Sequence, residues 1–279
     1  MSRLDRPPPP EPLPHPVVDN HCHLDVVFEG TEEWGPGRAL AEAAAVGVPR
    51  IVQIGCDVES SRWAVHTAEE LGGIVAGVAL HPNEAPRIAD QGELAAAWSE
   101  IEDLAAHPRV RAVGETGLDH YRTGPEGRAA QEESFRRHIR LASRLGKTLV
   151  IHDRDAHADV LRVVDEEGAP ELVVMHCFSG DASFARACLD RNFFLSFAGT
   201  VTFKNAAPLR EALVLVPRDR LLVETDAPFL TPTPYRGRPN ASYLVPTTVR
   251  AMAEVRGDDL EVLCRAIDET TEQAFGGAW

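Results

Sequence analysis

The sequence has no long hydrophobic run and no regular cysteine pattern, and both absences narrow the class of protein. No stretch of about 18 apolar residues occurs, so we expect no membrane-spanning helix. The amino terminus lacks the apolar core of a secretory signal peptide. The five cysteines are scattered and form no CxxC pair, which is typical of free thiols in a reducing compartment. We therefore expect a cytoplasmic protein with no disulfides and no membrane contact.

Basic residues are also scarce. The chain has 28 lysine and arginine residues against 43 acidic ones, with a formal net charge of −15 and a sequence pI near 5.2. This balance argues against a broad basic surface wrapped around duplex nucleic acid, so a nucleic-acid substrate would have to be held locally. Most of the acidic residues are expected to solvate helix surfaces, although a carboxylate excess also suits a protein that binds divalent cations.

Proline is concentrated at the amino terminus, where seven prolines lie between Pro7 and Pro16. We predict that residues 1–16 form a disordered, polyproline-like tail that packs on nothing. The remaining residues, 17–279, have an ordinary length for one domain with a large core.

Short apolar segments alternate with helical ones through this domain. Eight segments rich in Val, Ile, Leu and Phe have the length and composition of buried parallel strands: 17–19, 50–55, 74–80, 110–115, 148–152, 172–176, 193–198 and 221–225. Helical spacing is found at 37–45, 59–71, 91–106, 129–145, 156–167 and 247–275. Strict alternation predicts an α/β protein with a single TIM (β/α)8 barrel. The runner-up is an open doubly wound sheet, but no glycine fingerprint follows the first strand.

Residues that bind metals cluster at the ends of these predicted strands. His21 and His23 are two apart, so on a strand both imidazoles face the same side while Cys22 faces the other. The other members, at or just past the carboxyl ends of strands, are His81, Glu115, His152, His176 and Asp226. Any one of them could be structural, as a packed histidine or a helix cap. Their shared position, at the rim where barrel enzymes build their sites, favours a joint functional role.

The chemistry of this set indicates divalent cations. A carboxylate at position 115 can offer one oxygen to each of two cations, which a neutral ligand cannot do. Imidazoles and carboxylates together form a hard-to-borderline ligand set, suited to Mg, Mn or Zn rather than to soft metals.

Six ordered motifs give the chain a specific resemblance. They are DNHCHLD at 19–25, GVALHP at 77–82, GETGLD at 114–119, LVIHDRDA at 149–156, HCFSG at 176–180 and VETDAPFLTP at 223–232. The segment FLSFAGTVTFKNA at 194–206 adds to them. From about Val17 to the carboxyl terminus the sequence resembles the TatD family of metal-dependent deoxyribonucleases, within the amidohydrolase-like barrels.

The resemblance implies a binuclear site and a nuclease reaction. One of two divalent cations would be held by His21, His23 and Asp226, the other by His152 and His176, with Glu115 bridging. His81 would lie beside the substrate phosphate. The implied activity is Mg-dependent cleavage of nucleic acid, commonly from a 3′ end. The chain departs from the family pattern at Asn83, where a second histidine is frequent, at His138, where glutamine is common, and in RGRPNAS at 236–242.

We assign roles to individual residues on this basis. Asp226 is both a ligand and the candidate to take the proton of the attacking water, and Glu115 sets the metal spacing. Glu224 would either support the ligands from beneath or be a buried structural carboxylate. Arg154, Lys204 and Arg236 are candidates for holding phosphate, although an exposed basic residue is often only solvated. Tyr121, Phe178 and Phe203 could stack a base or simply pack.

Several alternatives share these ligands. A dihydroorotase-like amidohydrolase often bridges its metals with a carboxylated lysine on strand four, but the only lysines are Lys147 and Lys204, and neither ends that strand. Ester hydrolysis on aminoacyl-tRNA would use the same metals. A non-catalytic scaffold is disfavoured because all six ligand positions are filled. The expected partner is a single-stranded or frayed nucleic-acid end, and we favour a monomer.

Overall fold

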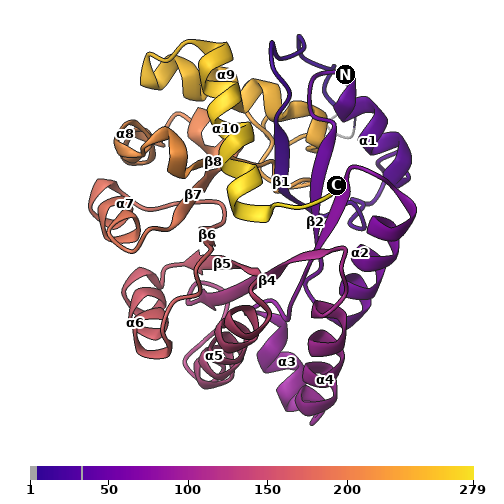
Figure 1. Ribbon diagram of the computed structural model, residues 1–279, viewed down its shortest axis with the longest axis vertical. Helices are drawn as coiled ribbons and strands as arrows, with labels where there is room; N and C mark the ends of the chain where they lie inside the picture. Colours follow the sequence, from indigo (N-terminus) through magenta and orange to yellow (C-terminus); the bar gives the residue numbers. More distant parts are fainter. Residues whose placement is uncertain (1–4, 33) are drawn as a thin grey trace.

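Eight parallel strands form the centre of the molecule. The computed structural model describes residues 5–32 and 34–279, and its strands pair in the order β1 to β8, each with the next. Their bounds are β1 (Val18–Cys22), β2 (Arg50–Ile54), β3 (Ile74–Val78), β4 (Val110–Asp119), β5 (Thr148–Arg154), β6 (Val173–Met175), β7 (Phe194–Phe197) and β8 (Leu221–Val223). Helices surround the strands (Figure 1). The predicted single-domain (β/α)8 barrel is confirmed.

The helices agree with the prediction in part. They are α1 (Pro36–Ala44), α2 (Val58–Glu70), α3 (Glu84–Asp90), α4 (Leu94–Ala105), α5 (Arg128–Leu145), α6 (His157–Glu167), α7 (Ala182–Leu189), α8 (Ala207–Leu215), α9 (Val245–Arg256) and α10 (Leu260–Phe275). The helix predicted over 247–275 was wrong as one element, because Gly257 ends α9 at φ 68° and Asp259 caps α10. No helix in the described ranges is both long and apolar enough to cross a membrane.

The barrel closes through backbone contacts between β1 and the segment after β8. Cys22 and Ala227 form a parallel bridge. The Asp226 N–H donates to the His21 carbonyl at 2.9 Å, and the His23 N–H donates to the Ala227 carbonyl at 2.7 Å. These bonds place the Asp226 side chain beside the two histidines of the first strand, although the residues are 200 positions apart in the chain.

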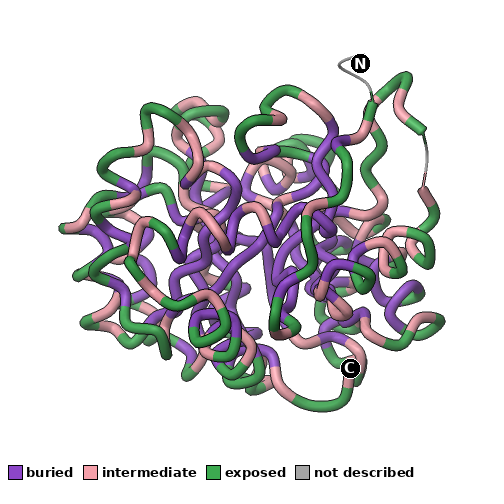
Figure 2. Tube along the Cα trace, turned by 90° about the horizontal axis from the view of Figure 1, so that it is seen from above, coloured by how far each residue is buried: buried purple, intermediate pink, exposed green. Residues whose placement is uncertain are grey.

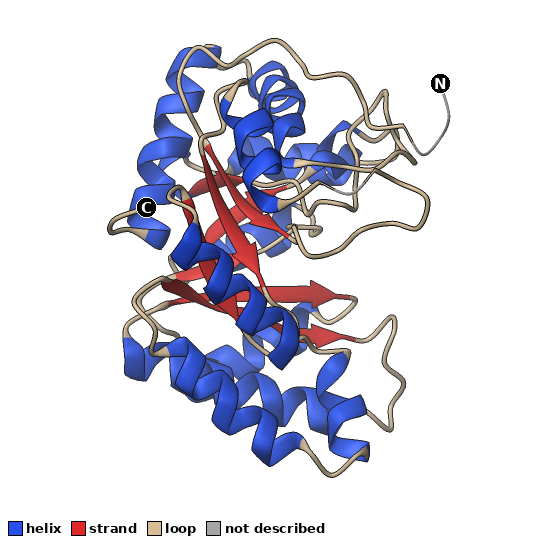
Figure 3. Cartoon of the chain, turned by 90° about the vertical axis from the view of Figure 1, so that its right-hand side faces the viewer, coloured by secondary structure: helices blue, strands red, loops and turns tan. Residues whose placement is uncertain are grey.

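The interior of the barrel is apolar and closed at one end. Its buried side chains include Val52, Val75, Val150 and Leu222, and Phe275 of α10 packs beneath them. A larger apolar layer lies between the strands and the surrounding helices, so burial is concentrated at the centre (Figure 2). In Figure 3 the strand arrows point toward the side where long loops gather, away from the carboxyl terminus. The carboxyl ends of the strands therefore face this open end of the barrel.

The amino-terminal segment corrects one expectation. Residues 1–4 lie outside the described residues, but residues 5–16 pack against the barrel, contrary to the prediction. Leu13 is buried and its N–H donates to the Val46 carbonyl at 3.1 Å. The Tyr243 hydroxyl donates to the Pro7 carbonyl, and His15 lies 2.9 Å from Asp268. A proline-rich strand offers free carbonyls because its own residues form few internal hydrogen bonds, and the barrel surface supplies their donors.

A buried carboxylate near the barrel closure should make the fold pH-sensitive. Asp19 accepts from the Thr225 N–H at 2.8 Å and from its hydroxyl at 2.6 Å, yet burial raises the pKa of Asp19 to about 7. Since this pKa lies above that of an unfolded aspartate, Asp19 makes its full contribution to the free energy of unfolding below about pH 4. This contribution is lost as pH rises toward 7. In metal-free wild type, we expect Asp19 to lower the free energy of unfolding by a few kcal/mol between pH 4 and 7, and Asp19→Asn should remove this decrease. Urea unfolding at a series of pH values measures it.

The control is Asp219→Asn, which removes a carboxylate that is 68% exposed. It should leave the pH dependence of the unfolding free energy as it is in the wild type. An unchanged slope between pH 4 and 7 in Asp19→Asn would show that Asp19 does not carry the effect.

Candidate metal centre

The six predicted metal ligands converge at the open end of the barrel. His21 and His23 come from the end of β1, Glu115 from within β4, and His152 from β5. His176 follows β6 directly, and Asp226 lies three residues beyond β8. Parallel strands bring their carboxyl ends to one rim, which is why residues spread over two hundred positions meet here.

Glu115 lies between two groups of ligands, and each of its oxygens faces one group. Its Oε1 is 3.7 Å from His21 Nε2 and 3.5 Å from His23 Nε2. Its Oε2 is 3.1 Å from His152 Nδ1 and 3.4 Å from His176 Nε2. Asp226 Oδ1 completes the first group at 3.4 Å from His23 Nε2. A carboxylate in this position can contribute one oxygen to each of two cations.

His21 provides a test of whether cations fit these residues. Its ring is fully buried, and neither nitrogen has a hydrogen-bond partner among the described residues. Burial, and then the neighbouring His176, lower the pKa of His21, so a lone pair is available. The two rings stack with centroids 3.5 Å apart. A buried imidazole with no protein partner is costly unless a ligand engages it, so the residues present fit a bound cation.

Contacts at the far ring nitrogens, a hydrogen bond for His23 and a short contact with a carboxylate for His176, orient two of the histidines. His23 Nδ1 donates to the Ile54 carbonyl at 3.0 Å, which directs Nε2 to the centre. His176 Nδ1 lies 2.8 Å from Glu224 Oε1, and that carboxylate also accepts from the Cys177 N–H at 2.9 Å and the Ser196 hydroxyl at 2.5 Å. Glu224 is fully buried. Partners of this kind fix the tautomer and ring orientation of metal-binding histidines.

Asp119 belongs to the site although the sequence analysis did not select it. Its Oδ2 lies 3.3 Å from His152 Nε2, and its side chain also accepts from the backbone N–H groups of Tyr121 and Arg122. β4 extends four residues beyond the predicted end at Glu115, so Asp119 points to the same face. Gly117 permits the close approach of β5, because a Cβ there would lie 2.0 Å from the His152 carbonyl oxygen.

Protonation couples these groups before any cation binds. Burial would lower the pKa of His152, but the carboxylates of Asp119 and Glu115 raise it to about 9. Burial would raise the pKa of Glu115, but His81 and His176 hold it well below its ordinary range. A cation must therefore displace protons from imidazoles, and metal affinity should increase with pH up to about 9.

His81 lies on the same rim as the ligands. Its Nε2 is 3.7 Å from Glu115 Oε2, and its ring centroid is 4.7 Å from that of His152. The Asn83 N–H donates to His81 Nδ1 at 3.0 Å, so in the neutral ring Nε2 carries the hydrogen. His138 holds Leu80, the residue before His81, because His138 Nε2 accepts from the Leu80 N–H at 3.1 Å.

Cys56 is a second residue that the sequence analysis did not select. Its Sγ lies 3.5 Å from Glu115 Oε1 and 3.8 Å from His23 Nδ1. Burial raises the pKa of this thiol to about 12. No motif marks this cysteine, and only its position just after β2 would have pointed to the rim.

Five of the six predicted ligands line a cavity of about 490 Å³, and His21 lies buried behind it. Four carboxylates line it, Glu84, Glu115, Asp119 and Asp226, against two guanidinium groups, Arg122 and Arg154. Arg154 lies 4.1 Å above the Tyr121 ring. Of the predicted phosphate-binding residues, Arg154 reaches this cavity, Arg236 lines a neighbouring one, and Lys204 is exposed and lines neither. Phe178 is buried in the core and cannot stack a base there.

Comparisons with known proteins agree over nearly the whole chain. Residues 18–276 match the family described as TatD related DNase. A Mycobacterium tuberculosis protein, "Uncharacterized metal-dependent hydrolase TatD", is 47% identical over 94% of this chain and 99% of its own length. Bacillus subtilis YabD, also called an uncharacterized metal-dependent hydrolase, is 39% identical over 93% and 98%. The solved structure of YJJV, a TatD homolog from Escherichia coli, superimposes with a TM-score of 0.85 at 24% identity, covering 94% of this chain and 98% of that one.

Proposed function

This chain belongs to the TatD-related DNase family of metal-dependent hydrolases, and on that premise we propose that it cleaves phosphodiester bonds of nucleic acid. The proposed cofactors are two divalent cations, Mg, Mn or Zn. The preferred substrate is a single strand or a frayed end, degraded from the 3′ terminus. The observation that carries the proposal is Glu115, whose two oxygens each face a separate group of ligands.

The charge of the cavity supports an anionic substrate. Its four carboxylates outnumber its two guanidinium groups, so the cation-free site would repel a phosphate. Two divalent cations would reverse this sign. A phosphodiester is then attracted, and the same cations would lower the pKa of a shared water and neutralise charge on the phosphate in an in-line displacement.

The protein groups have distinct proposed tasks. Glu115 offers one carboxylate oxygen to each ligand group and so would set the spacing of the two cations. The Asp226 carboxylate, 3.4 Å from His23, accepts the proton of the attacking water. The Nε2–H of His81 donates a hydrogen bond to the scissile phosphate or the leaving oxygen, and the ring keeps its proton. Arg122 and Arg154, at the cavity edge, bind neighbouring phosphates.

A substrate panel tests this function. Metal-loaded protein is incubated with end-labelled single strands, blunt and frayed duplexes and charged tRNA, and the products are identified. We expect shortening of single strands, abolished by chelation and restored by Mg or Mn. Release of the amino acid from tRNA with intact strands would favour the deacylase alternative. Full activity in chelator-treated protein would refute metal dependence altogether.

Salt dependence tests local binding. Two arginines at the cavity and a net charge of −15 leave few phosphate contacts. The logarithm of affinity plotted against the logarithm of salt concentration should therefore have a slope of about −1 to −3. The measurement is oligonucleotide binding across a salt series with metal held constant. A slope near about −8 would indicate an extended basic track and would contradict the proposal.

A further inference from the structure

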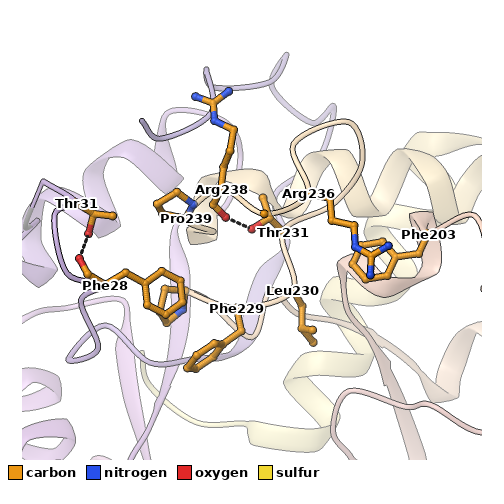
Figure 4. A pocket seen from close by; sticks show the side chains of 11 residues that line it. Phe28, Thr31, Phe203, Phe229, Leu230, Thr231, Arg236, Arg238 and Pro239 are labelled. Carbon is orange, nitrogen blue, oxygen red and sulfur yellow. Dashed lines mark hydrogen bonds between the residues drawn. The ribbon is translucent and has the colours of Figure 1, made fainter. Parts of the chain in front are cut away.

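A second cavity adjoins the metal centre, and the proposed mechanism does not use it. It has a volume of about 470 Å³ and shares Phe229 and Leu230 with the metal cavity. Its apolar wall consists of these two residues with Phe28, Phe203, Pro228 and Pro239. Figure 4 labels all of them except Pro228. A volume of this size is in the range of small-ligand sites.

Phe229 stands between the two cavities. Its ring centroid is 6.2 Å from that of His23 and 5.5 Å from that of Phe28, in edge-to-face geometry. Phe229 is 41% exposed, so its ring is accessible to a bound group. A group that packs on this ring would therefore lie next to whatever is bound by the ligands of the metal centre.

The charge of the second cavity differs from that of the first. None of the described residues that line it is acidic, and two of them, Arg236 and Arg238, are basic. The guanidinium of Arg236 lies 4.3 Å from the centre of the Phe203 ring (Figure 4). An arginine held flat on an aromatic ring presents a planar, positively charged face, the combination that binds a base and the adjoining phosphate.

The wall of this cavity is held in place before a ligand arrives. Leu230 has φ 54°, in the left-handed region that a branched side chain rarely occupies. Its carbonyl fits against Gly199, where a Cβ would lie 2.4 Å from that oxygen. Asn240 Nδ2 donates to the Phe229 carbonyl at 2.6 Å. Such over-determined backbone is common at binding sites, because a preformed surface loses little entropy on binding.

We infer that this cavity is a nucleobase subsite: the base of the nucleotide next to the scissile phosphate stacks on Phe229 and is flanked by Arg236. The inference rests on the proposed nuclease function and adds the recognition of a base. The subsite requires an unstacked base, because the faces of a base are covered in a duplex. It would therefore account for the proposed preference for single strands through chemistry that does not depend on the cations.

The test removes the base, the ring or both. Single-stranded 10-mers carry an abasic residue at each of the three positions nearest either end, and kcat/KM is measured for metal-loaded protein. At one position, base removal should lower kcat/KM of the wild type about 10-fold, within the range for base–aromatic stacking. Phe229→Ala should abolish this difference between normal and abasic substrate, and Phe229→Trp should restore it. Tyr235→Ala, in the same loop but outside both cavities, should behave as the wild type.

A binding measurement separates this inference from the nuclease function. The same 10-mers carry 2-aminopurine at the sensitive position if the cleavage assay has located one, and otherwise at each position in turn. The fluorescence of 2-aminopurine should be quenched on binding to the wild type but not to Phe229→Ala. Cleavage with identical base effects in both proteins would overturn the subsite and leave the nuclease. Quenching that depends on Phe229 without cleavage would support the subsite and overturn the nuclease. Neither quenching nor cleavage would overturn both.

Discussion

Glu115→Ala should lose metal at both sites and activity by about three orders of magnitude or more, because the cations each supply several kcal/mol of catalysis. The variant removes the one carboxylate whose oxygens face both ligand groups. It also removes the negative charge that offsets the repulsion between the two cations. Elemental analysis of the purified variant and a nuclease assay measure the two effects.

Two variants sharpen this result. Glu115→Gln keeps the shape of the side chain but removes its charge, so it should also lose metal, less completely than alanine. His21→Ala removes a proposed ligand only from the group around Oε1, although its ring also stacks on His176, and we expect it to lose about one equivalent of metal. Unchanged stoichiometry in Glu115→Ala would rule out the bridging role.

His81→Ala should lower kcat about 10²–10³-fold, the usual cost of one preorganised hydrogen-bond donor, while both metals stay bound. The reason is the tautomer: Nδ1 accepts the Asn83 N–H, so Nε2 presents a hydrogen to the cavity. Burial lowers the pKa of His81 to about 3, so the ring stays neutral at ordinary pH. The ring therefore acts as a hydrogen-bond donor, and the acid limb of the pH–rate profile should be the same in the variant.

The control for His81 is Asn83→Ala. It removes the amide that donates to Asp119 Oδ2 at 3.1 Å but keeps the backbone N–H that orients His81. Its loss of kcat should be much smaller. Metal analysis decides a separate question, because His81 Nε2 lies only 3.7 Å from Glu115 Oε2. If His81→Ala loses metal, His81 is itself a ligand and the set of six is incomplete.

Much of the barrel could be predicted because its strands are buried on both faces and read as continuous apolar runs. The helices were harder where local breaks interrupt a regular pattern. The predicted helix over 91–106 begins later, at Leu94, because Gly92 has φ 74° and ends the preceding turn. The short helices α3, α7 and α8 were not predicted at all. They have 7, 8 and 9 residues, so each offers few repeats of the helical period.

The residues of the site were predictable to the extent that they end strands. Asp119 was overlooked because the predicted strand stopped at Glu115, four residues too early. The cavity beside the metal centre could not be found from sequence, since Phe28 and Phe229 come from loops two hundred positions apart. Lys204 has the right charge, but no local pattern tells whether an exposed lysine faces a cavity.

The amino-terminal segment has a practical consequence for anyone handling this protein. Arg238, which lines the second cavity, donates to the backbone carbonyls of Asp5 and Arg6, and Arg6 in turn reaches the Asn240 carbonyl. The described part of the chain therefore begins, at Asp5, beside the second cavity, and an amino-terminal tag would be tethered to this segment. A tag after Trp279 would emerge at the opposite, closed end (Figure 3). Kinetics compared between laboratories should use the carboxyl-terminal tag, or an amino-terminal tag that has been removed.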